Sequence, residues 1–96
     1  MQPLYLVAEI RPKFEVRDQV RAKLDALIAA ALLEDGCVVY DLVVSEDDPD
    51  TWLMIEKWAS RESWDAHMLT THVVAFLAEG VSLFREPTEL RLYNPA

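Results

Sequence analysis

Two consecutive segments in the middle of the chain carry apolar residues on both faces of any strand that they form. Residues 37–45 (CVVYDLVVS) and 51–58 (TWLMIEKW) are rich in β-branched and aromatic residues, and their even and odd positions are both mainly apolar. The turn-forming sequence EDDPD at residues 46–50 separates them, which predicts a hairpin. A sheet with one face in water alternates apolar and polar residues, so both faces of this hairpin are expected to be covered.

A strand and a helix precede the hairpin, and helices and a strand follow it. Between residues 16 and 32 the apolar positions recur with the period of one helix face, and Gly36 can end this helix in the left-handed conformation. The predicted elements are a strand at residues 4–10, this helix, the hairpin, a helix at 60–68 capped by Ser60, a helix from Thr70 or Thr71 to Glu79 that stops at Gly80, and a strand at 88–93.

This βαββαβ order is the ferredoxin-like α+β plan, in which helices cover one face of an antiparallel four-stranded sheet. The helices reach only one face of the sheet, yet the central strands are apolar on both. The other face is therefore expected to pack on the sheet of a second copy. The sequence predicts a homodimer formed through the sheet face.

The bulk properties limit the classes of partner. The 96 residues, 52% of them hydrophobic, suit a single domain spanning residues 1–96. A formal net charge of −8 argues against nucleic acid and against an anionic membrane surface. Cys37 is the only cysteine, so it forms no intrachain disulfide and is expected to be a packing residue. The N-terminal residues lack a basic region and no apolar run is long enough to cross a bilayer, so a cytoplasmic protein is expected.

Residues 56–72 (EKWASRESWDAHMLTTH) hold both histidines of the chain within a short distance of a carboxylate. On one continuous helix His67 and His72 would lie about 140° apart around the axis, too far to share an ion. Their spacing also differs from that of the HExxH zinc motif. They could meet near Glu56 only across a break in the helix, so we expect no metal site.

Each group in this stretch has a structural and a functional interpretation. Either histidine could act as a general base, or it could be a half-buried helix residue bonded to a backbone carbonyl. Glu56 lies in an otherwise apolar strand and needs a partner, which would be an arginine or lysine in a structural role or a histidine in a catalytic one. Trp58, Trp64 and Phe76 could line an aromatic pocket or simply form core.

Three segments together resemble the antibiotic biosynthesis monooxygenase family over nearly the whole chain. They are AEIRP near the start, EDGCVVYDL after the long helix, and EKWASRESWDAHMLTTH after the hairpin. The family pattern is E-x-G-C-x-x-Y followed by E-x-W and H-x4-H, and the matching residues are Glu34, Gly36, Cys37, Tyr40, Glu56, Trp58, His67 and His72.

The resemblance implies a quinol-monooxygenase-like protein of the dimeric α+β barrel superfamily. It would oxidise a small phenolic or quinol-type aromatic with O2, without flavin, haem or metal. A histidine would act as base or proton relay, with Glu56 to orient it. The implied catalytic residues are His67, His72 and Glu56, and the implied substrate-binding residues are Trp58, Trp64, Tyr40, Met54, Phe76 and Ile10.

Two other functions remain open. Family relatives include isomerases of small signalling sugars, and the fold also suits a non-catalytic dimer that binds a small molecule. Haem degradation is not expected, because the asparagine and histidine of haem-degrading relatives fall on Ile10 and Leu77, which offer no iron ligand.

Overall fold

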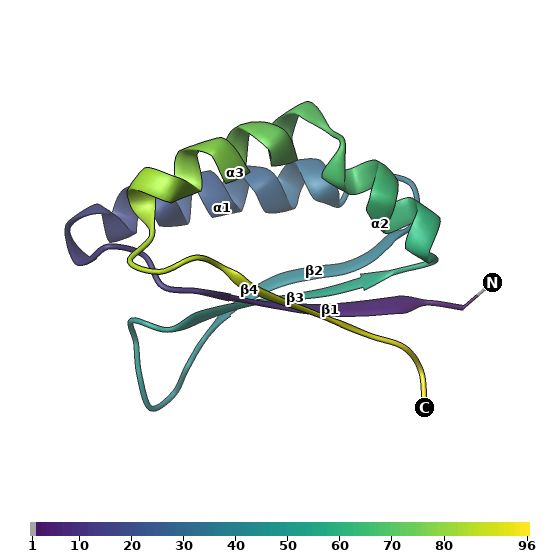
Figure 1. The fold of residues 1–96 in the computed structure, drawn as a ribbon, viewed down its shortest axis with the longest axis horizontal. Helices are drawn as coiled ribbons and strands as arrows, with labels where there is room; N and C mark the ends of the chain where they lie inside the picture. Colours follow the sequence, from purple (N-terminus) through teal and green to yellow (C-terminus); the bar gives the residue numbers. More distant parts are fainter. Residues whose placement is uncertain (1) are drawn as a thin grey trace.

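The computed structural model describes residues 2–96, in which a layer of helices lies on one face of a four-stranded sheet (Figure 1). The strand order is β2-β3-β1-β4, and every neighbouring pair is antiparallel. This is the predicted ferredoxin-like α+β fold. Its elements are β1 (Leu4–Ile10), the 3-10 helix η1 (Phe14–Val16), α1 (Arg17–Ala31), β2 (Cys37–Val44), β3 (Trp52–Trp58), α2 (Arg61–Met68), α3 (Thr71–Leu83) and β4 (Glu89–Tyr93).

The core lies between the helices and the inner face of the sheet. On β1, Leu6 and Ile10 point inward and are buried, and on α1 Val20 and Leu24 are fully buried against them. Burying a side chain of this size stabilises the fold by roughly 2 kcal/mol. The strand pairing places Tyr40 and Leu6 on either side of Glu56, so a carboxylate stands in the middle of this apolar face.

The last helix is longer than the sequence predicts. It runs through Gly80 to Leu83, so the expected stop at Gly80 is wrong. A Cβ atom at Gly80 would lie 2.9 Å from the ring of Phe84. The glycine is therefore explained by this close approach of an aromatic ring and not by the end of a helix.

The chain bends between α2 and α3. The Thr70 side chain caps α3 by accepting from the Val73 amide, and it donates to the carbonyl of His67 at 2.7 Å. The two helices lie at 63° to each other. No single helix in residues 2–96 is long and apolar enough to cross a membrane, although α2 and α3 together would meet the length and composition criteria.

The outer face of the sheet has no helix over it (Figure 1). Tyr5, Val43, Ile55 and Tyr93 are 38–47% exposed there, which agrees with the apolar pattern of both faces of the central strands. Packing of this face on a second copy stays a prediction.

Candidate active site

A cavity of about 220 Å³ lies between the sheet and the helices. Its wall is mainly apolar and includes residues of β1, β2, β3, α1, α2 and α3. Leu77 of α3 and Leu90 of β4 also line it and are 50% and 39% exposed, so the cavity reaches the surface between these two elements. Of the residues predicted for the site, those that line the cavity are Ile10, Tyr40, Met54, Glu56, Trp64, His67 and Phe76.

Two predicted site residues lie elsewhere. Trp58 is fully buried behind His67, with the two ring centroids 4.5 Å apart, so it supports the histidine ring and is not part of the cavity wall. His72 is one-third exposed and borders a separate hollow of about 200 Å³ beside Lys23 and Glu79. The predicted aromatic wall is thus formed by Trp64 and Phe76 without Trp58.

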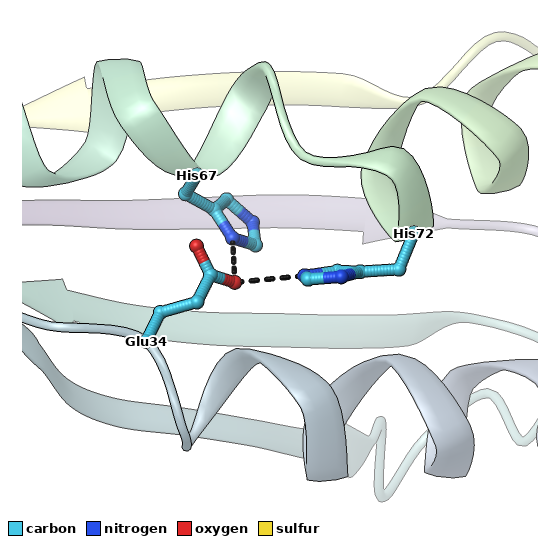
Figure 2. Close-up of side chains that lie close together, drawn as sticks. All are labelled: Glu34, His67 and His72. Carbon is cyan, nitrogen blue, oxygen red and sulfur yellow. Dashed lines mark hydrogen bonds and ion pairs between the residues drawn. The ribbon is translucent and has the colours of Figure 1, made fainter.

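Glu34 joins the two histidines. Its Oε2 atom lies 2.7 Å from Nδ1 of His67 and 2.9 Å from Nε2 of His72, and Figure 2 shows the three side chains converging from different elements. Glu34 follows the C-terminus of α1, and Gly36 then turns the chain into β2 with φ = 83°. A left-handed residue at this point lets the carboxylate point back at α2 and α3.

Glu34 was part of the sequence motif but received no role from the sequence. The sequence feature that could have pointed to Glu34 is its position in the E-x-G-C-x-x-Y pattern, two residues before Gly36. The expectation that His67 and His72 are too far apart assumed a continuous helix. The bend at Thr70 removes this obstacle, and both rings reach one carboxylate oxygen.

The contact with Glu34 determines which nitrogen of His67 is available for chemistry. A carboxylate only accepts hydrogen bonds, so Nδ1 of a neutral ring carries the proton and Nε2 is left as the acceptor. Nε2 lies 3.5 Å from the hydroxyl of Tyr40, which also lines the cavity. Burial lowers the pKa of His67, against the opposing effect of Glu34. Burial raises the pKa of Tyr40, so its hydroxyl stays protonated.

Glu56 has a different partner from those predicted. Its Oε1 accepts a hydrogen bond from the indole nitrogen of Trp58 at 2.9 Å. Within residues 2–96 it makes no ion pair with an arginine or lysine and no hydrogen bond with a histidine, so the predicted role as histidine orienter is wrong for this geometry. Glu34 is the carboxylate that orients His67. Burial raises the pKa of Glu56, and the Trp58 hydrogen bond opposes the shift.

The site therefore combines a neutral imidazole whose Nε2 is unprotonated and lies beside the Tyr40 hydroxyl, a carboxylate bonded to Nδ1, and an apolar cavity that the histidine lines. This is the base and orienter arrangement of general base catalysis. Burial raises the pKa of the Cys37 thiol to about 11, which disfavours the thiolate that a nucleophile needs.

Comparison with known proteins identifies a family for this chain. The sequence profile of the family "Antibiotic biosynthesis monooxygenase" matches residues 3–79. The chain is 31% identical over 93 residues to "Putative monooxygenase Rv0793" of Mycobacterium tuberculosis, covering 97% of this chain and 91% of that protein. It is 29% identical over 87 residues to "Putative monooxygenase YcnE" of Bacillus subtilis, covering 91% of this chain and 92% of that protein.

Solved structures show the same fold. The structure of Rv0793 superposes with a TM-score of 0.93 and covers 98% of this chain and 95% of its own. That of PA3566 from Pseudomonas aeruginosa, 26% identical, superposes with a TM-score of 0.90 and covers 100% and 96%. With sequence profile, sequence identity and fold in agreement, the chain belongs to the antibiotic biosynthesis monooxygenase family.

Proposed function

We propose that this protein is a monooxygenase that oxidises a small phenolic or quinol-type aromatic with O2 and needs no cofactor. The observation that carries the proposal is the orientation of His67, whose Nδ1 is held by Glu34 while Nε2 points toward a cavity-lining hydroxyl. Membership of the family and the names of its relatives support a monooxygenase.

His67 would start the reaction by taking the phenolic proton of the substrate on Nε2. The imidazolium that forms keeps its Nδ1–H bond to Glu34, which becomes charge-assisted and stabilises the cation. The electron-rich phenolate then passes an electron to O2, and the two radicals combine at a ring carbon. The carbon that is attacked carries a hydrogen, and the peroxide formed on it takes the proton back from the His67 imidazolium. Loss of this hydrogen and of hydroxide as water leaves a carbonyl on that carbon, so one oxygen atom enters the product, the other leaves as water, and the substrate supplies all the electrons.

The cavity sets the size of the substrate. A cavity of about 150 Å³ in another protein holds benzene, so 220 Å³ suits a substituted single ring. Met54, Trp64 and Phe76 offer apolar surface to such a ring, and their bulk keeps water from the reacting carbon. Glu56 and Tyr40 are the polar residues on the sheet side of the cavity, and the Glu56 carboxyl can hydrogen-bond a substrate hydroxyl.

The alternative functions have less support. The residues that line the cavity include no arginine or lysine, so the phosphate group of a small signalling sugar would have no counter-charge there. A non-catalytic binding protein would be favoured by a pocket that its own tryptophans fill, whereas a cavity of ligand size is present.

We also propose that two copies pair through the outer faces of their sheets. The exposed apolar residues there, Tyr5, Val43, Ile55 and Tyr93, support this pairing. Sedimentation equilibrium at micromolar concentration should give twice the mass of one chain. A folded monomer would contradict the proposal.

The activity test is oxygen consumption by chelator-treated protein with a panel of single-ring quinols and polyphenols. Replacing His67 by glutamine should lower the rate by roughly 10²- to 10⁴-fold, as expected for loss of a general base. The matched control, Glu79→Gln, changes a half-exposed carboxylate near His72 and should keep the wild-type rate. Circular dichroism checks that each variant folds. Wild-type rates in His67→Gln would refute the base role, and no uptake with any substrate would refute the monooxygenase.

A further inference from the structure

The cluster of Glu34, His67 and His72 has the composition of a metal site. One ligand atom from each of the three residues lies within 4.8 Å of the other two, and the residues come from the end of α1, from α2 and from α3. We propose that this cluster binds one divalent transition-metal ion, Zn²⁺ being the reference case, through Oε2 of Glu34, Nδ1 of His67 and Nε2 of His72. This differs from the expectation of no metal that the spacing of the histidines suggested.

Two of the three distances between ligand atoms are close to those of a tetrahedral site, and the two nitrogens lie within 4.8 Å of each other. Nitrogen and oxygen ligands lie about 2.0–2.1 Å from Zn²⁺, which places neighbouring ligand atoms about 3.3 Å apart. The two nitrogens are 2.7 and 2.9 Å from the shared oxygen, so each distance must widen by only about half an ångström. The ion takes the place of the two bridging protons. Each neutral ring keeps one proton, which moves from the ligating nitrogen to the other ring nitrogen.

Groups around the cluster already hold the ligands in place. A histidine that binds a metal normally donates its other N–H to a fixed acceptor. For His67 that acceptor is the buried hydroxyl of Tyr40, 3.5 Å from Nε2. The ring of Trp58 packs against the same imidazole at 4.5 Å and restrains its rotation.

The ion would lie on the opposite side of the His67 ring from the cavity. The ligating Nδ1 points to Glu34 and His72, neither of which lines the cavity, while Nε2 points to Tyr40, which does. His72 is one-third exposed beside its own hollow, where water can supply the fourth ligand and where an ion can enter. In that hollow Lys23 is paired with Glu79, so its charge is compensated.

Binding there would inactivate the base. With the metal on Nδ1, Nε2 of His67 carries the proton and can no longer accept one from a substrate. This consequence rests on the proposed function, but the binding itself does not, because it can be measured without substrate or oxygen.

The test is titration of chelator-treated protein with ZnCl2 by calorimetry, and with CoCl2 by visible absorption, which distinguishes tetrahedral from octahedral coordination. We expect one ion per chain and a tetrahedral Co²⁺ spectrum. Glu34→Gln and His72→Gln should each weaken binding more than about tenfold, a loss that removal of even a supporting group can cause. His72 is partly exposed, so its replacement should not disturb folding.

Two control variants show whether the binding is specific. Cys37→Ser removes the one thiol near Glu34, and Glu79→Gln removes a carboxylate beside His72; both should bind like the wild type. A ¹⁵N-histidine NMR spectrum should also show the His67 proton moving from Nδ1 to Nε2 when Zn²⁺ is added. The proposal is overturned by absence of saturable binding, by unchanged affinity in Glu34→Gln and His72→Gln, or by an equal loss in the two controls.

Discussion

The hydrogen bond between Glu34 and His67 should contribute to the free energy of unfolding, which can be measured. His67 is 2% exposed, and its Nδ1–H has the Glu34 carboxylate as acceptor at 2.7 Å. In Glu34→Ala this buried donor loses its acceptor, which costs about 1–3 kcal/mol. The second bond, to the partly exposed His72, can be replaced by water and adds under about 1 kcal/mol. The free energy of unfolding should therefore fall by about 2–3 kcal/mol.

Glu34→Gln separates the hydrogen bond from the charge. The amide oxygen can accept from both rings, and only the charge-assisted part is lost, so we expect a decrease of about 1 kcal/mol. In a domain of this size, the Glu34→Ala change corresponds to a drop in melting temperature of roughly 8–24 °C.

The assay is urea unfolding followed by tryptophan fluorescence. All variants are compared at one protein concentration, because association would shift the apparent stability. Glu46→Ala, in the exposed turn between β2 and β3, is the control and should change stability by less than about 0.5 kcal/mol. If Glu34→Ala costs no more than this control, or if the glutamine costs as much as the alanine, the hydrogen bond does not hold the histidine as described.

Two further changes test the surroundings of the site. Gly36→Ala should destabilise the protein by about 2 kcal/mol or more, because the backbone has φ = 83° and a Cβ would lie 2.2 Å from Oγ of Ser63; a melting temperature within 2 °C of the wild type, against the roughly 8 °C or more expected, would contradict this. Glu56→Gln should be more stable than the wild type at neutral pH, since the raised folded-state pKa of Glu56 means that its charged form is disfavoured. The gain should shrink as pH falls and disappear below about 4.5, the pKa of an unperturbed glutamate, because the wild-type carboxyl is then protonated in both the folded and the unfolded state. Urea midpoints that show a constant or inverted difference from pH 4 to 7 would refute the assignment.

The sequence predicted the fold because local signals agreed with one another. The runs of β-branched and aromatic residues in the strands, the caps at Ser60 and Thr70 and the left-handed position at Gly36 are all features of residues close in the chain. Gly80 shows where such signals fail. A glycine that ends a helix and one that admits a neighbouring ring look identical in sequence, and only the position of Phe84 separates them.

The sequence predicted most residues of the candidate site, but it did not predict which carboxylate contacts the histidines. The family pattern identified both histidines, but Glu56 was chosen as their partner because it is the one charged residue facing inward in its strand. Glu34 lies 33 residues before His67, and nothing local shows that the end of α1 faces α2. Which carboxylate meets which histidine depends on how the helices cross the sheet, and this is a long-range property.

The bend at Thr70 determines how far apart the two imidazole rings lie. One hydroxyl both caps α3, by accepting from the Val73 amide, and donates to the carbonyl of His67 near the end of α2. If α2 and α3 formed one straight helix, His67 and His72 would point to different sides of that helix although neither residue had changed. A homologue with both histidines but without a capping residue between them would therefore be expected to lack the shared carboxylate contact. For this reason H-x4-H carries meaning only together with the hydroxyl residue inside it.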